Sequence, residues 1–193
     1  MKSKLLITLL SGLISISINA QWEAGIGAGL GLPVTGYKEV LKSGWLLNAD
    51  GKYRFGSGNF AVGMKAQFTR LQKDNNPGDA FQNARMTIAP LLFTAEWVVP
   101  TKGALEPYIT GGLGVTFFNL NYDISPTEGE TVNNVSFTMM PQAGLRYGAS
   151  EKVFPFIEAG LVLLADGPPV GFPKGSQMTG YTGITAGISY RFN

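Results

Sequence analysis

The chain has 193 residues, enough for one domain, and it contains neither Cys nor His. Without Cys it can have no disulfide framework, thiolate metal site or lipoprotein anchor, and without His it lacks the commonest general base and metal ligand. Charged residues make up only 15% of the chain and 26 residues are Gly, but a hydrophobic share of 45% argues against disorder.

The N-terminus has a pattern of its own. Lys2 and Lys4 precede an apolar stretch over residues 5–18, and Ala20 supplies the small residue that a signal-peptidase site requires. The stretch is too short for a membrane anchor, because a spanning helix needs about 20 apolar residues. The pattern therefore predicts a signal peptide that is cleaved after Ala20.

Residues 1–20 are thus set apart as the leader, and residues 21–193 are predicted to form one domain. Once the two lysines of the leader are removed, 13 of the 15 basic residues remain, against 13 acidic ones. The mature chain is formally neutral and has no basic stripe, so we expect no nucleic acid partner.

The mature chain repeats with a period of two, which predicts strands with one apolar and one polar face. Segments of about 9–13 residues follow this pattern, the length that a tilted strand needs to cross a bilayer. In chain order they cover residues 22–32, 45–55, 60–68, 87–99, 107–117, 137–147, 154–164 and 181 to the end.

Two prolines fit this pattern poorly. Pro141 lies in the middle of the sixth segment, where it removes a ladder donor, so we expect a β-bulge there. Pro90 and its apolar neighbours blur the start of the fourth segment, which leaves the strand register open at that point.

The connections alternate in length. Short turns are expected at residues 56–59, 100–106 and 148–153, and long loops at residues 33–44, 69–86, 118–136 and 165–180. This alternation is typical of bacterial outer-membrane barrels, whereas a soluble β-sandwich has no reason to keep it. We predict an all-β fold, an eight-stranded antiparallel up-and-down transmembrane β-barrel with both termini in the periplasm and four long extracellular loops.

The charges of the segments fall on the face opposite the hydrophobic residues. In a membrane barrel of this size that face lines an interior just wide enough for side chains to fill it, so the charges must be paired. Gly25, Gly27, Gly29 and Gly31 leave room opposite for long side chains. The predicted polar network of the lumen consists of Glu23, Asp50, Lys52, Arg54, Lys65, Glu96, Gln142, Arg146, Glu158 and Arg191.

A soluble lipocalin-like barrel would exchange the two faces, with the apolar residues inside. The aromatic residues favour the membrane, because two girdles are what the bilayer interfaces select. We expect one girdle near the short turns, with Trp22, Phe55, Phe60, Trp97, Tyr147, Tyr190 and Phe192, and one near the long loops, with Trp45, Phe68, Phe117 and Phe137.

The last strand ends in Tyr190-Arg191-Phe192-Asn193, an alternating strand that closes on an aromatic residue. With the leader, the glycine-rich first strand and the run Pro107-Tyr108-Ile109-Thr110-Gly111-Gly112-Leu113-Gly114, it resembles the small outer membrane β-barrel proteins of the OmpA/OmpX type. Asn193 departs from the family, in which Phe usually comes last. The resemblance covers nearly all of residues 21–193. It implies the fold and a place in the bacterial outer membrane, with membrane lipid and the barrel-assembly machinery as partners.

The resemblance carries no catalytic residues. The enzymatic barrels of this membrane rely on His, which this chain lacks, so we expect a non-enzymatic protein without cofactor. The loop acids Asp123, Glu128 and Glu130 fit no calcium loop, so no metal is expected.

We expect the barrel to have a structural or surface-interaction role, with an extracellular ligand at the loops. The polar lumen is read first as structural and second as a narrow conduit whose Arg–Glu pairs exchange partners. The alternative function is a narrow porin-like channel or a carrier for small or hydrophobic solutes, because the inward residues Leu92, Phe156 and Val162 could line a pocket.

Overall fold

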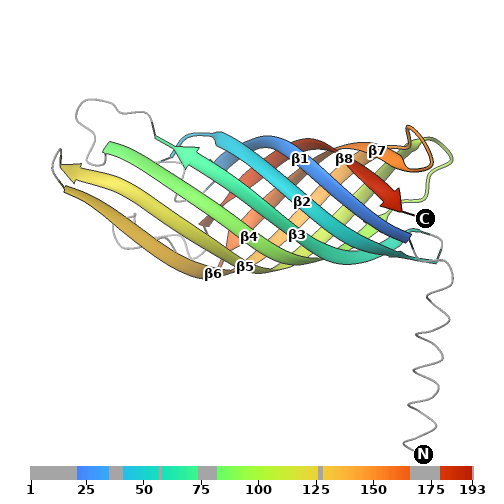
Figure 1. Ribbon diagram of the computed structural model, residues 1–193, viewed down its shortest axis with the longest axis horizontal. Coiled ribbons are helices and arrows are strands. Elements are labelled where there is room, and N and C mark those ends of the chain that lie inside the picture. The colour runs from blue at the N-terminus through green and yellow to red at the C-terminus, as the bar shows by residue number, and fades with distance from the viewer. Residues whose placement is uncertain are drawn as a thin grey trace, which may run out of the picture.

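The computed structural model describes residues 21–34, 41–56, 58–73, 82–125, 128–165 and 179–192. Eight antiparallel strands close into a barrel in which each strand pairs with its neighbours in sequence and the last pairs with the first (Figure 1). This confirms the predicted fold class. The strands are β1 (Gln21–Val34), β2 (Gly44–Phe55), β3 (Phe60–Gln72), β4 (Gln82–Val98), β5 (Leu105–Ser125), β6 (Glu128–Tyr147), β7 (Val153–Leu164) and β8 (Thr179–Phe192). The predicted signal peptide lies outside the described residues.

The two ends of the barrel differ. β1 begins and β8 ends at the same end, which also holds the connections β2–β3, β4–β5 and β6–β7 (Figure 1). We call this the turn end and the opposite one the loop end. The β2–β3 turn is closed by a 2.9 Å bond from the Gly58 N–H to the Phe55 carbonyl, and Gly56 and Gly58 adopt φ values of 48° and 80°. Glycine enters this region without steric penalty, which explains the tight turn.

The prediction of a long loop over residues 118–136 is wrong. β5 and β6 stay paired through most of it and form a hairpin that extends, with β4, past the other strands at the loop end (Figure 1). The period of two continues there with its polarity reversed, since Phe118 and Leu120 are buried inside while Asn121 is exposed outside. β3 and β4 likewise take up parts of the predicted loop 69–86. The remainders of the other three predicted loops include residues 35–40, 74–81 and 166–178, which lie outside the described residues.

The expected bulge at Pro141 is also wrong, because the register of the β6–β7 pair is the same on both sides of it. Met139 lies opposite Leu163 and Gln142 opposite Gly160, while Met140 and Pro141 take no partner on β7. Proline removes one ladder donor, and the flanking pairs suffice to hold the register. Around Pro90 the β4–β5 ladder is continuous, which settles the register that the sequence left open.

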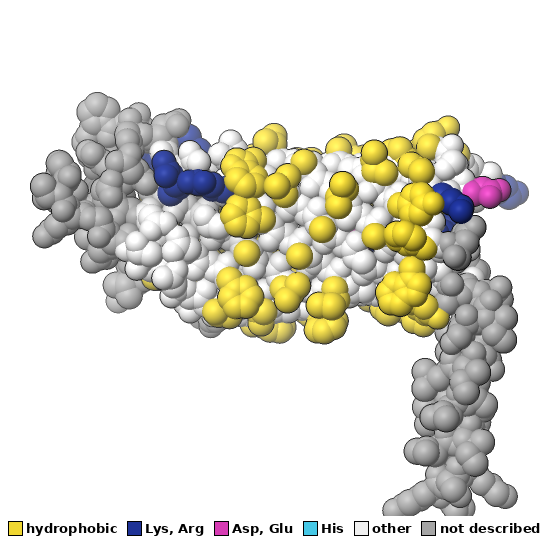
Figure 2. All heavy atoms as spheres, viewed as in Figure 1, with side chains coloured by type: hydrophobic (Ala, Val, Ile, Leu, Met, Phe, Trp, Pro, Cys, Tyr) yellow, Lys and Arg dark blue, Asp and Glu magenta, His cyan; other side chains and the backbone are white. Residues whose placement is uncertain are grey.

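The outer surface carries a hydrophobic band with charged side chains beyond it at both ends (Figure 2). All the aromatic residues predicted for the girdles lie on this outer face. At the turn end Trp22 contacts Tyr53 at a ring distance of 5.2 Å, and at the loop end Trp45 stacks on Phe68 at 5.3 Å. From Trp45 to Phe55 along β2, a tilted strand rises by about 25 Å, the height of the apolar band on outer-membrane barrels.

Candidate functional site

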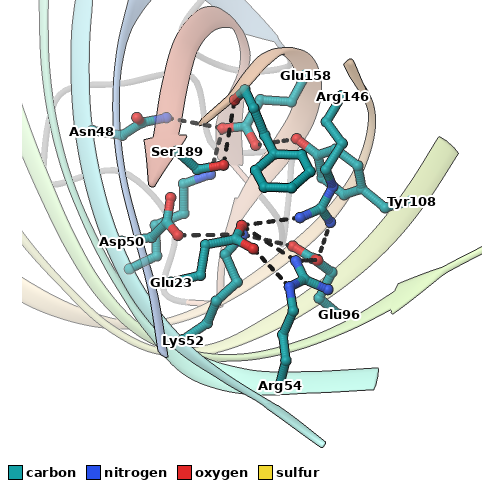
Figure 3. A network of polar contacts seen from close by, with 12 residues as sticks. Glu23, Asn48, Asp50, Lys52, Arg54, Glu96, Tyr108, Arg146, Glu158 and Ser189 are labelled. Carbon is teal, nitrogen blue, oxygen red and sulfur yellow. Dashed lines mark hydrogen bonds and ion pairs between the residues drawn. The ribbon is translucent and has the colours of Figure 1, made fainter. Parts of the chain in front are cut away.

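The inside of the turn half is lined with charged side chains that β1, β2, β4, β6 and β8 direct inward (Figure 3). Strand alternation puts every second residue of each strand on this inner face. We call this group the turn-end cluster; its members are Glu23, Asp50, Lys52, Arg54, Glu96, Arg146 and Arg191.

Glu23 lies at the centre of the turn-end cluster and is only 1% exposed. Its carboxylate accepts hydrogen bonds from Arg54 Nε at 2.6 Å and Arg146 Nη1 at 3.0 Å. Lys52 and Arg191 each lie at 3.4 Å from it. Cations from three other strands thus meet one carboxylate of β1, which ties these strands together across the lumen.

Glu96 is the second shared carboxylate. It accepts a 2.6 Å bond from Arg54 Nη2, a 2.7 Å bond from Lys52 Nζ and a further bond from Arg146. Arg54 and Arg146 therefore each bridge the same two carboxylates. Buried charges are tolerated when such bonds satisfy them, because the loss of hydration is otherwise expensive.

The borders of the cluster are less completely satisfied. Asp50 Oδ2 lies 3.3 Å from Lys52 Nζ and accepts no hydrogen bond from the described residues. The Arg191 guanidinium lies 4.1 Å from the centre of the Phe154 ring, and that of Arg146 lies 4.6 Å from Tyr108. These stacked positions are favourable for a planar cation.

A second polar group surrounds Glu158 halfway along the barrel. Glu158 pairs with Lys65, and it accepts bonds from Asn48 at 2.9 Å, Thr185 at 3.0 Å and Tyr108 at 3.0 Å. Lys65 also donates to Gln142 Oε1 at 3.1 Å. The ten residues of the predicted network thus lie inside the barrel, in two groups.

Sequence reasoning missed Asn48, Tyr108 and Thr185 as members of this network. Their phase in the alternation was the available signal, because it assigns each of them to the inner face. The predicted network consists of charged residues and Gln142, whereas these three are neutral. The structure makes them the neutral donors that complete the hydrogen-bonding shell of Glu158.

The loop half of the lumen is filled by hydrophobic side chains, none more than 3% exposed. We call this the apolar block. A small polar contact is enclosed in it, where the Tyr181 hydroxyl is bonded to Gln67 at 2.5 Å and to Thr69 at 3.1 Å. The apolar block consists of Leu41, Leu46, Leu71, Ala84, Met86, Ile88, Leu92, Phe118, Leu120, Met140, Val162, Leu164 and Tyr181.

The predicted pocket beside Leu92, Phe156 and Val162 is wrong for the described part of the lumen. Leu92 and Val162 are each 1% exposed and belong to the packed block. The Phe156 ring fills the space beside an inner glycine, since a Cβ built on Gly187 would lie 2.5 Å from it. A cavity lined by residues of both halves measures about 10 Å³, which is room for about one water molecule.

The inner glycines of β1 make space as predicted. A Cβ at Gly25 would lie 2.7 Å from Asp50 Oδ1, and one at Gly27 would lie 2.7 Å from Asn48 Oδ1.

Among the described residues no group of His, Cys, Asp and Glu is arranged to hold a metal ion, and no helix is long and apolar enough to cross a membrane. The side chains of Asp123, Glu128 and Glu130 lie outside the described ones.

Three solved structures illustrate the similarity of the fold. A major outer membrane protein from Thermus thermophilus gives a TM-score of 0.63 at 11% identity, over 90% of this chain and 100% of that one. Neisserial surface protein A gives 0.56 at 11% identity, over 90% and 97%. Ail, the attachment invasion locus protein of Yersinia pestis, in complex with the heparin analogue sucrose octasulfate, gives 0.51 at 18% identity, over 90% and 97%.

At these identities the solved structures establish the fold alone. A search of curated proteins gives no match. The model of the outer membrane protein beta-barrel domain, in contrast, matches residues 6–192, which is nearly the whole chain. The protein is therefore a β-barrel of the bacterial outer membrane, and it belongs to the outer membrane protein beta-barrel domain family.

Proposed function

We propose that this protein is a closed, non-enzymatic barrel that presents an interaction surface outside the cell and does not conduct solutes. The observation that carries the proposal is the filling of the lumen, with the turn-end cluster in one half and the apolar block in the other. A solute would have to pass first through a bonded network of charges and then through packed hydrocarbon.

The turn-end cluster and the apolar block oppose permeation through different interactions. In the turn half, Arg54 and Arg146 bridge Glu23 and Glu96, so a passage opens only if several charge-assisted bonds break together. In the loop half, a polar solute would lose its hydration among side chains that offer few hydrogen bonds. The cavity of about 10 Å³ between them is far smaller than a solute site.

We propose further that the loop end faces outward and that both termini lie in the periplasm. The short turns at one end and the projecting β5–β6 hairpin at the other support this orientation. Lipid would contact the hydrophobic band, the assembly machinery would bind β8, and an extracellular ligand would bind at the hairpin. Two of the similar structures carry names that point to the cell surface, a surface protein and an attachment invasion locus protein.

Conductance in planar bilayers tests the closed lumen. The purified barrel should insert and give no steady current at a range of voltages. Insertion is checked in parallel by heat modifiability, since a folded barrel migrates differently on a denaturing gel before and after boiling. Reproducible single-channel steps from the wild-type barrel would contradict the proposal and favour the channel.

Labelling of intact cells tests the orientation, and the absence of native Cys makes an introduced thiol unique. Thr131→Cys, which is exposed on the hairpin, should react with a membrane-impermeant maleimide on intact cells. Lys102→Cys, in the β4–β5 turn, is the matched control and should react only after the outer membrane is permeabilised. The reverse labelling pattern would mean that the turn end, and not the loop end, faces outward.

A further inference from the structure

The outer face of β3, β4, β5 and β6 changes character just beyond the aromatic residues of the loop end. Two residues past Phe68 and Phe117, apolar side chains give way to arginine and to residues with amide or hydroxyl groups. We call this surface the outer polar strip; its members are Arg70, Arg85, Thr87, Asn119, Asn121, Thr131 and Asn133.

The two arginines of the strip are close together, and neither forms an ion pair with a described carboxylate. Thr87 of β4 lies directly opposite Arg70 of β3, and Arg85 comes two residues before Thr87 on the same strand. The two arginines are therefore diagonal neighbours, with Cα atoms about 7–8 Å apart. Arg70 Nε is buried without a hydrogen-bond partner. Among the described side chains no carboxylate pairs with either arginine, whereas Arg54 and Arg146 in the lumen each bind two.

The other members of the strip form a ladder of hydrogen-bonding groups. Asn119 Nδ2 donates to Asn133 Oδ1 at 2.6 Å, and the Thr131 hydroxyl donates to Asn121 Oδ1 at 2.7 Å. These cross-strand bonds hold the amides side by side on the outer surface. Each amide and hydroxyl keeps further donor or acceptor capacity that faces outward.

A hollow of about 370 Å³ joins this ladder to the hydrophobic band. Thr87, Asn119 and Asn133 line it with polar groups. Ala89, Phe117 and Val135 line it with apolar ones. The hollow is therefore amphipathic and lies at the border of the hydrophobic band, where we expect a lipid to change from headgroup to acyl chain. Figure 2 shows basic side chains at this border of the band.

We propose that the outer polar strip binds the phosphorylated sugar headgroup of a glycolipid in the outer leaflet. Arg70 and Arg85 would bind the phosphate, because a guanidinium fork matches phosphate oxygens and no carboxylate among the described side chains pairs with either of them. The amide and hydroxyl ladder would bind sugar hydroxyls. Phe117 and Val135 would contact the first part of an acyl chain. This inference rests on the proposed outward orientation of the loop end.

Binding of defined lipids to the full mature barrel in detergent tests the inference, with native mass spectrometry as the readout. The probes are bisphosphorylated lipid A, the same lipid without its phosphates, phosphatidylglycerol and inorganic phosphate. We expect lipid A to bind most tightly. The double variant Arg70→Gln, Arg85→Gln should weaken its binding by about tenfold or more, since bonds to charged groups are lost.

Matched variants separate the components. Lys102→Gln with Lys152→Gln removes two exposed positive charges at the turn end and should bind lipid A like the wild type. Asn133→Ala should weaken the binding of lipid A more than that of phosphatidylglycerol. All variants must keep the heat-modifiable migration of the wild type, which shows that they fold.

Three results would overturn the inference: equal binding by the Arg70→Gln, Arg85→Gln variant, equal binding of the lipid without phosphates, or displacement of lipid A by equal amounts of phosphatidylglycerol or inorganic phosphate. Because binding in detergent does not depend on orientation, the Thr131→Cys labelling decides separately whether the strip lies in the outer leaflet. If the wild-type barrel does not bind lipid A selectively but Thr131→Cys is labelled on intact cells, the strip alone is rejected. If Thr131→Cys is labelled only after permeabilisation, the orientation is rejected.

Discussion

The two halves of the lumen are filled by opposite chemistry on one continuous set of strands. β4 directs Glu96 inward in the turn half and Met86 inward in the loop half, with the same alternation in between. The outer face changes as well, from apolar along the hydrophobic band to polar on the projecting hairpin. Along one strand, the inner face is first polar and then apolar, while the outer face is first apolar and then polar. Between the two ends lies a stretch in which both faces are apolar. The surroundings of each stretch, lipid or water outside and the lumen inside, decide which pattern is stable.

We expect substitutions in the two halves of the lumen to lower stability for different reasons. In the turn half Glu23 and Glu96 are each shared by several cations, so removing one of these carboxylates leaves buried cations incompletely paired. In the loop half the contacts are not directional, and a smaller side chain loses contact area and leaves a cavity. Single substitutions with matched controls can separate these two responses.

The largest effect is expected from Glu23→Ala. The change leaves the Arg54 and Arg146 guanidinium groups with one shared carboxylate fewer, and it should lower the free energy of unfolding by about 3–5 kcal/mol. Urea unfolding in lipid vesicles, followed by tryptophan fluorescence, measures it. Glu106→Ala is the control, because that side chain is 31% exposed and its 3.5 Å ion pair with Arg146 should contribute less than about 1 kcal/mol. Equal losses in the two variants would refute the central role of Glu23.

Met86→Ala is the corresponding change in the apolar block. Met86 is fully buried, and its truncation should lower the free energy of unfolding by about 3 kcal/mol through lost contacts and a cavity. The same unfolding experiment applies. Thr131→Ala, exposed on the hairpin, should stay within about 0.5 kcal/mol of the wild type. A Met86→Ala barrel as stable as the wild type would mean that the block is loosely packed.

An arginine scan sharpens the contrast on the outer face. Phe93→Arg places a cation in the hydrophobic band, where the native ring is 70% exposed, and should reduce stability by about 2–4 kcal/mol. Asn133→Arg places the same side chain on the outer polar strip and should reduce it by about 0–1 kcal/mol. Similar values at both positions would mean that the band does not mark the hydrocarbon region.

The smallest expected effect compares two glycines. A Cβ at Gly29 would lie 1.8 Å from the Ile184 carbonyl oxygen, so Gly29→Ala should shift the backbone and reduce stability by about 1–3 kcal/mol. Gly111 faces outward and has nothing within 4 Å of a built Cβ, so Gly111→Ala should leave the unfolding midpoint nearly unchanged. A larger loss for Gly111→Ala would reverse the assignment of the two faces.

Sequence reasoning reached the strands and the charged lumen because both depend on local alternation. The phase of Glu23, Arg54 and Arg146 within their own segments suffices to predict that they face the interior. Their pairing was not accessible in this way, because Glu23 and Arg146 are 123 residues apart and meet only through the registers of the closed barrel.

The loop half escaped prediction for a physical reason. Hydrophobicity predicts the outward face only where lipid surrounds the strand, and this rule fails where the surroundings change from lipid to water. Phe118 and Asn119 follow the same alternation as Thr116 and Phe117, but with polarity reversed. A search for alternation of either sign over residues 118–136 would have predicted the hairpin.

The meeting of four strands at Glu23 bears on how this barrel enters its membrane. The carboxylate on β1 contacts Arg54 of β2, Arg146 of β6 and Arg191 of β8, so its set of cations is complete only when the last strand has reached the first. A sheet that entered the membrane before closure would expose unpaired charged side chains to hydrocarbon, which is a state of high free energy. Insertion and closure are therefore expected to proceed as one cooperative step.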